Sequence, residues 1–195
     1  MTTAGLYDVD FASRDIHRVV LGLAESLDED QLRWRPDDFA TSIGFHLWHL
    51  ARESDYLRSV IVERYTFLGP GFGPPTEIWT REGLAARWGF PEGLATAVGT
   101  GLTDEVAAAL PIPGKAEVLD YLRRSYADLE AFVEGVDQRF PPGTEATLDE
   151  EAARRLGNLR LNVLNFLTHD CRHLGMMEVL KGLQTGFGSA TESRD

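Results

Sequence analysis

The sequence predicts an all-α fold, a four-helix bundle with a long crossover between its second and third helices. Apolar residues recur at helical spacing in four long segments, and no segment shows the strict alternation of a strand bounded by hairpin turns. A stretch rich in Gly and Pro, residues 69–114, separates the second segment from the third. We therefore expect one domain over residues 1–195, with its core at about residues 8–185 and a flexible tail at 186–195.

The first two helices are expected in the N-terminal third of the chain. The first runs from about residue 8 or 10 to residue 26 and leaves through a loop at residues 28–39. Its apolar stripe consists of Ile16, Val19, Val20, Leu23 and Leu27. The second helix covers residues 43–67, because Ser42 is a good N-cap residue and Gly69 with Pro70 ends the periodic pattern.

The crossover and the last two helices follow. Residues 69–114 are too many for a simple connection, so we expect one or two short helices there, one of them capped by Thr80, folded over another part of the molecule. The third long helix is expected over residues 115–136, and Pro141, Pro142 and Gly143 break the chain after it. The fourth is expected over residues 159–183, preceded by a turn through residues 149–155.

Charge and composition exclude several classes of protein. The net charge of −12 argues against binding to a phosphate backbone, so no nucleic acid partner is expected. No run of about 18 apolar residues is present, which argues against a membrane span. The N-terminus lacks the pattern of a secretory signal, and a lone Cys171 cannot form an internal disulfide. These observations favour a cytoplasmic location.

Two histidines stand out in the apolar run "LNFLTHDCRHLGMMEVLKGL". His169 and His173 are four residues apart, so they lie only about 40° apart around a helix and can converge on one point. Such pairs recur in helical metal sites, although a histidine on an apolar helix can also be a hydrogen-bonded core residue. Cys171 lies about 200° from His169 around the axis, so we expect it to be a small packing residue outside the site.

The second helix offers further ligands in "FHLWHLARE". His46, His49, Glu53 and Tyr56 fall within about one quadrant of that helix, so one or two of its imidazoles can meet the pair on the last helix. Three neutral imidazoles with an open position suit Zn²⁺ or Ni²⁺. His17 is isolated on the first helix and is expected to be structural or exposed.

The histidine face of the last helix also carries polar and apolar neighbours. They are Asn162, Asn165, Phe166, Met176 and Leu180. The asparagines can orient ligands or substrate, or they can face solvent. Of the two, Asn165 is our candidate for a residue that contacts substrate or cofactor.

The motifs "SIGFHLWHLARESDYL", "EIWTREGLAARWGFP" and "THDCRHLGMMEVLKGLQ" resemble the DinB-like superfamily of four-helix-bundle proteins over about residues 10–185. The resemblance implies a divalent metal ion held by His49, His169 and His173. His46 stands where many relatives have an apolar or aromatic residue, so it is expected to support a ligand or face substrate. The second motif resembles the crossover that covers the site in relatives, where Trp79 or Trp88 either walls the pocket or simply packs.

The superfamily includes enzymes that use a small thiol such as mycothiol or bacillithiol. The resemblance therefore implies a metal-dependent S-transferase or isomerase that acts on a small-molecule substrate with an external thiol. Glu53 would then orient His49 or shuttle a proton, unless it forms only a surface salt bridge. Two alternatives stay open: a hydrolase that activates water at the same ion, and a non-enzymatic metal-binding stress-response protein. A homodimer is expected by analogy with relatives.

Overall fold

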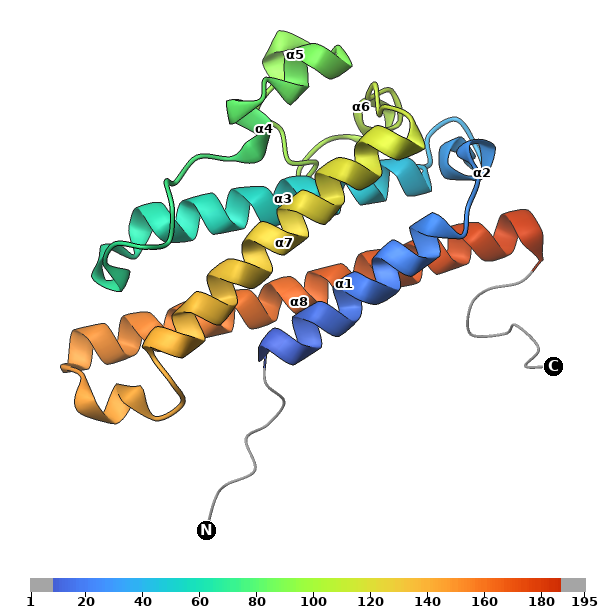
Figure 1. Cartoon of the computed structure of the whole chain (residues 1–195). Helices are drawn as coiled ribbons and strands as arrows, with labels where there is room; N and C mark the ends of the chain where they lie inside the picture. Colours follow the sequence, from blue (N-terminus) through green and yellow to red (C-terminus); the bar gives the residue numbers. More distant parts are fainter. Residues whose placement is uncertain (1–8, 187–195) are drawn as a thin grey trace.

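The computed structural model describes residues 9–186, and their side chains from residue 12 onward (Figure 1). Four long helices run alongside one another and form the bundle: α1 (Val9–Glu25), α3 (Ile43–Arg64), α7 (Lys115–Arg139) and α8 (Glu150–Thr185). No strand occurs within the described range, so the all-α prediction is confirmed. Residues 187–195 of the expected flexible tail lie outside the described residues.

Side-chain caps explain where the long helices begin. The Ser42 hydroxyl accepts a hydrogen bond from the backbone N–H of Phe45 and starts α3 at the predicted place. The Asp149 carboxylate accepts from the N–H of Ala152, and α8 therefore begins at Glu150. The expected turn through residues 149–155 was wrong, because those residues form the cap and first turns of one helix of 36 residues.

Short helices fill the connections between the long ones. The expected exit loop at residues 28–39 contains α2 (Glu29–Arg33), which Asp28 caps with Gln31. The expected second helix stops at Arg64, and a separate 3₁₀ turn, η1 (Thr66–Leu68), follows it. The crossover holds α4 (Ile78–Arg81), α5 (Leu84–Trp88), η2 (Glu92–Leu94) and α6 (Asp104–Ala108), and η3 (Thr144–Thr147) precedes α8.

The crossover is fastened to α3 by a buried polar network. The two carboxylate oxygens of Asp55 accept from the backbone N–H groups of Ile78 and Trp79, both at 2.9 Å. Arg52 donates to the carbonyl of Ala97 and to Glu77. The expected Thr80 cap was wrong: Thr80 lies inside α4, whose first N–H groups find their acceptor on α3 instead. Residues 69–114 thus cover one side of the bundle, as Figure 1 shows.

Two apolar clusters hold the helices together. The larger one joins α1, the first half of α3, the crossover, the start of α7 and the end of α8. The smaller one joins the end of α3, the end of α7 and the start of α8, and its largest contributors include Ile61, Phe132 and Leu156. Both clusters bury aliphatic and aromatic surface, which is the dominant favourable contribution to folding.

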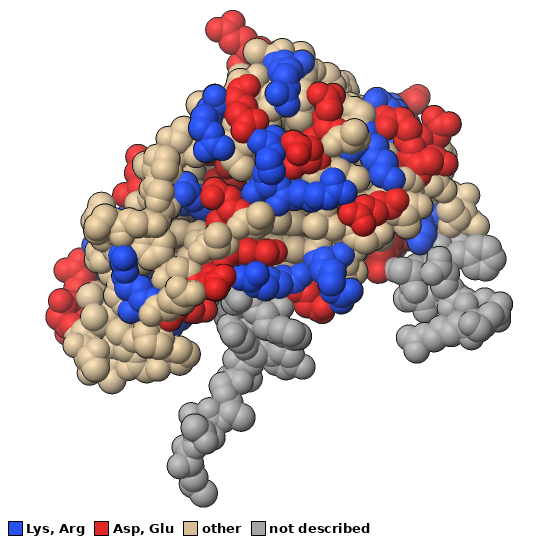
Figure 2. Space-filling view, viewed as in Figure 1, with Lys and Arg blue, Asp and Glu red and all other residues tan. Residues whose placement is uncertain are grey.

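The surface between α1 and α7 carries paired charges. Arg14 lies 2.9 Å from Glu134, and Arg123 lies 2.8 Å from Glu25. Figure 2 shows basic and acidic side chains interspersed on this face. Such exposed pairs each add little stability. Among the described residues, none of the helices is both long enough and apolar enough to cross a membrane.

Candidate metal centre

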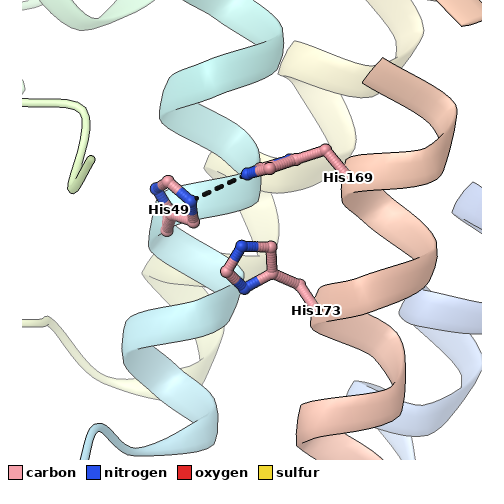
Figure 3. A group of neighbouring side chains, drawn as sticks. All are labelled: His49, His169 and His173. Carbon is pink, nitrogen blue, oxygen red and sulfur yellow. Dashed lines mark hydrogen bonds between the residues drawn. The ribbon is translucent and has the colours of Figure 1, made fainter. Parts of the chain in front are cut away.

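Three imidazoles converge between α3 and α8 (Figure 3). His49 comes from α3, His169 and His173 come one turn apart from α8, and one ring nitrogen of each lies within 4.8 Å of the others. The Nε2 atoms of His49 and His169 are 3.0 Å apart. Two nitrogens bound to one tetrahedral Zn²⁺ at about 2.0–2.1 Å lie roughly 3.3 Å from each other, so the spacing suits a shared ion.

The other ring nitrogen of each imidazole faces a polar partner. His49 Nδ1 lies 2.5 Å from the carbonyl oxygen of Val98, and because a carbonyl only accepts, this nitrogen must carry the proton. His173 Nδ1 lies 2.9 Å from His46 Nδ1. His169 Nδ1 lies 3.5 Å from the Asp170 carboxylate. All three Nδ1 atoms are thus turned outward, and the three Nε2 atoms are left for a common ligand.

The pKa values of His46, His49 and His173 favour the neutral rings that a metal requires. Burial, followed by the proximity of His49, lowers the pKa of His46 to about 4. Burial, followed by the neighbouring imidazoles, lowers the pKa of His173 to about 3. Burial also lowers the pKa of His49. At neutral pH these rings keep free lone pairs, so the residues present fit a divalent ion with a nitrogen-rich ligand set.

Comparison with known families identifies the chain. The family model of the DinB superfamily matches residues 14–177, which include all three histidines. The chain belongs to the DinB superfamily. A search of the curated proteins finds no match. Membership of the superfamily and the cluster of three histidines are both compatible with metal binding.

His46 is the fourth imidazole of the centre. Its side chain is buried, with its Nε2 3.2 Å from the Thr41 hydroxyl and its Nδ1 against His173. It also lines a pocket of about 720 Å³ between the loop before α3 and the last turns of α8. His46 therefore stands between that pocket and His173, where it can both orient a ligand and contact a bound molecule.

Glu53 and Asn165 lie at the margin of the centre. The half-buried Glu53 accepts a hydrogen bond from Thr100 at 2.7 Å, whereas the Nδ1 of His49 is held by the crossover carbonyl. The Glu53 carboxylate acts on His49 by raising its pKa against the stronger effect of burial. Asn165 is exposed, and the structure favours the solvent-facing alternative for its side chain.

The tryptophans and the cysteine differ in their surroundings. Trp79 and Trp88 are buried and pack edge to face at 5.3 Å, with Arg52 over the Trp79 ring. The packing alternative therefore describes both. Cys171 is exposed, so its expected role as a packing residue was wrong. It is not part of the histidine cluster, in agreement with the prediction that it lies outside the site.

Sequence reasoning missed two buried polar residues next to the centre. Asp170 is 2 % exposed and contacts His169, and His17 is 3 % exposed and contacts Asp170. The alternative of an exposed His17 was wrong. Asp170 could have been noticed, because it is a carboxylate in the same apolar run that drew attention to the histidines. His17 could not have been linked to it, since α1 and α8 are far apart in the sequence.

Proposed function

We propose that the protein is a divalent-metal-dependent enzyme whose ion, Zn²⁺ or Ni²⁺, is held by His49, His169 and His173. The observation that carries the proposal is the convergence of three imidazoles whose outer nitrogens already face polar partners. Such a set leaves a fourth position for a small molecule, as in catalytic rather than structural zinc sites. His169 keeps 16 % of its side-chain surface exposed, which supports access to that position.

The reaction proposed is a thiol-dependent transfer or isomerisation with an external thiol of the mycothiol or bacillithiol type. When bound, the ion would lower the pKa of a coordinated thiol and favour the thiolate near neutral pH. In a transfer, the S–H bond of the thiol breaks, a C–S bond to the substrate forms, and the leaving group departs with its electron pair. Glu53 is the proposed acceptor of the thiol proton, since its carboxylate already acts on His49.

The pocket beside His46 is the proposed site of the small-molecule substrate. Its volume of about 720 Å³ is typical of ligand pockets. Its apolar lining includes Phe39, Met176, Val179 and Leu183, each about half exposed or more. This lining favours a substrate with an apolar body, and Arg172, Asp37 and Asp104 add charges of both signs to the pocket.

Elemental analysis tests the metal. Purified wild type should carry about one equivalent of a divalent metal, and His169→Ala should carry little, because two imidazoles bind far more weakly than three. Asn165→Ala is the matched control: it lies one turn earlier on α8, is exposed, and should keep the metal. A wild type that binds no divalent ion, or a His169→Ala variant that binds it fully, would contradict the proposed centre.

A substrate panel tests the reaction. The metal-loaded protein should consume at least one electrophile in a manner that requires both the added thiol and His169. If no electrophile is consumed with any thiol, the transferase proposal loses its basis. Consumption without thiol, by hydrolysis, would instead support the alternative in which the same centre activates water.

A non-enzymatic metal-binding protein is the remaining alternative. A melting experiment with and without chelator addresses it, because an ion that serves only the fold should be lost together with the folded state. A homodimer in the cytoplasm is also proposed. The exposed residues Leu161 and Leu164 on α8 offer apolar surface to a second copy, and sedimentation at several concentrations measures whether one binds.

A further inference from the structure

A chain of polar contacts leads from His169 into the interior of the bundle. The Nδ1 atom of His169 lies 3.5 Å from Oδ1 of Asp170, and Oδ2 of Asp170 lies 3.3 Å from Nε2 of His17. The Nδ1 atom of His17 lies 2.6 Å from Oε1 of Glu130. The four residues come from α8, α1 and α7, so the chain connects three helices of the bundle.

The middle of this chain is deeply buried. Asp170 and His17 are 2 % and 3 % exposed, and the ring of Tyr126 stacks on His17 at 3.6 Å. Both nitrogens of His17 face carboxylates. Burial opposes the charged ring, but the hydrogen bonds and charges of Asp170 and Glu130 outweigh it and raise the pKa of His17, which favours a ring that donates to both. Burying the two ionisable groups Asp170 and His17 is costly unless they are paired and hydrogen-bonded.

Asp170 has one oxygen left for the metal centre. Its Oδ1 and the Nδ1 of His169 are both buried, and neither has another hydrogen-bond partner among the described residues. Once Nε2 of His169 binds an ion, its Nδ1 must carry the proton and becomes a donor that faces a carboxylate. The separation of 3.5 Å exceeds a formed bond, and closing it satisfies two buried atoms at once.

The other two ligands lack a carboxylate in this position. His49 faces the carbonyl of Val98, and His173 faces the neutral ring of His46. Asp170 is therefore the carboxylate that faces the outer nitrogen of a ligand, where it can offset the charge of an ion on three neutral imidazoles. A carboxylate behind a ligating histidine fixes its tautomer and ring orientation and raises its basicity.

We propose that Asp170 is a positioning residue for the metal centre: it holds His169 with Nε2 toward the ion, and His17 and Glu130 hold Asp170 in turn. The inference rests on the proposed metal centre and adds to it a supporting chain outside the ligands. His17 donates to Asp170 and to Glu130, and Glu130 reaches the surface, where Arg14 lies 3.8 Å from it. The orientation of His169 is thereby tied to α1 and α7.

Metal affinity and the spectrum of bound Co²⁺ test the inference. Asp170→Asn keeps the shape of the side chain but removes its charge, and should weaken Zn²⁺ binding about 10- to 100-fold in competition with a chromophoric chelator. The visible bands of its Co²⁺ form should shift, which a merely structural role would not cause. His17→Gln should change both quantities in the same direction by a smaller factor, and it serves if Asp170→Asn does not fold.

Tyr126→Phe is the matched control. The Tyr126 ring stacks on His17, and the substitution removes a buried hydroxyl that has no hydrogen-bond partner in the described part of the chain, so Zn²⁺ affinity and the Co²⁺ spectrum should stay as in wild type. If wild type binds Zn²⁺ and the folded Asp170 and His17 variants bind it equally well with unchanged Co²⁺ bands, the inference is wrong and the metal centre stands. If wild type binds neither ion, the proposed function fails, and the inference fails with it.

Discussion

The two ends of the bundle use the same helices in different ways. At the apolar end, which is the smaller cluster, α3, α7 and α8 meet through aliphatic and aromatic side chains such as Ile61, Leu129 and Leu156. At the histidine end, the same α3 and α8 enclose four imidazoles and a buried carboxylate. Apolar contacts are sufficient to pack these helices, so the polar residues at the histidine end are better explained by a ligand than by the fold.

The largest effect on stability is expected at the apolar end. Leu156 is fully buried there, and Leu156→Ala should cost about 2–5 kcal/mol of unfolding free energy, because it removes buried apolar surface and leaves a cavity. Chemical denaturation of the metal-free protein measures the loss. The metal content of the folded variant should stay unchanged. If Leu156→Ala also lost the metal, the two ends would be coupled and could not be treated as separate.

An intermediate effect is expected when the histidine end is acidified. The folded pKa of His46 is about 4, below the usual 6.5, so between these values the unfolded chain takes up a proton that the folded protein does not. Stability therefore falls as pH decreases through this window, by on the order of 3 kcal/mol for this residue in the metal-free protein. Denaturation curves from pH 7 to pH 4, recorded with chelator, measure the slope.

Two variants separate this slope from the titration of carboxylates. His46→Gln should reduce the dependence of stability on pH, since it removes the resisted protonation of His46 and leaves His49, His173 and the carboxylates in place. Leu156→Ala should lower stability at every pH and keep the slope of wild type, because it lies at the apolar end. Equal slopes in wild type and His46→Gln would show that the buried ring does not resist protonation.

The long helices and the pair His169 and His173 were predictable because both depend on local spacing, whereas His49 was assigned from the family resemblance. Helical periodicity located α1, α3, α7 and most of α8, and the four-residue interval placed His169 and His173 on one face. The cap of α4 was missed because its acceptor, Asp55, lies on another helix. The start of α8 was missed because its first turns are held by the Asp149 cap and carry few apolar residues.

The supporting residues could not be predicted for a related reason. The contacts of Asp170 and His17 can be recognised only when α1, α7 and α8 are packed, since each residue contacts another that is distant in sequence. Cys171 shows the converse limit. Helical geometry gives its direction relative to His169, but whether another helix covers that direction depends on the packing of the whole bundle.

The smallest effect is expected at Cys171, which lies between two of the ligands in sequence but on the outer surface of α8 in space. It is exposed, so Cys171→Ser should change the unfolding free energy by no more than about 0.5 kcal/mol. Metal content should also match wild type, because Cys171 is not part of the histidine cluster. The oxygen of serine is a poor substitute for a thiolate ligand, so this variant would lose metal if the sulfur coordinated the ion. Loss of metal in this variant would show that the Cys171 thiol contributes to the metal centre, and that this residue does not lie outside it. If the variant retains the metal, the reactive sulfur in the proposed reaction must come from an external thiol.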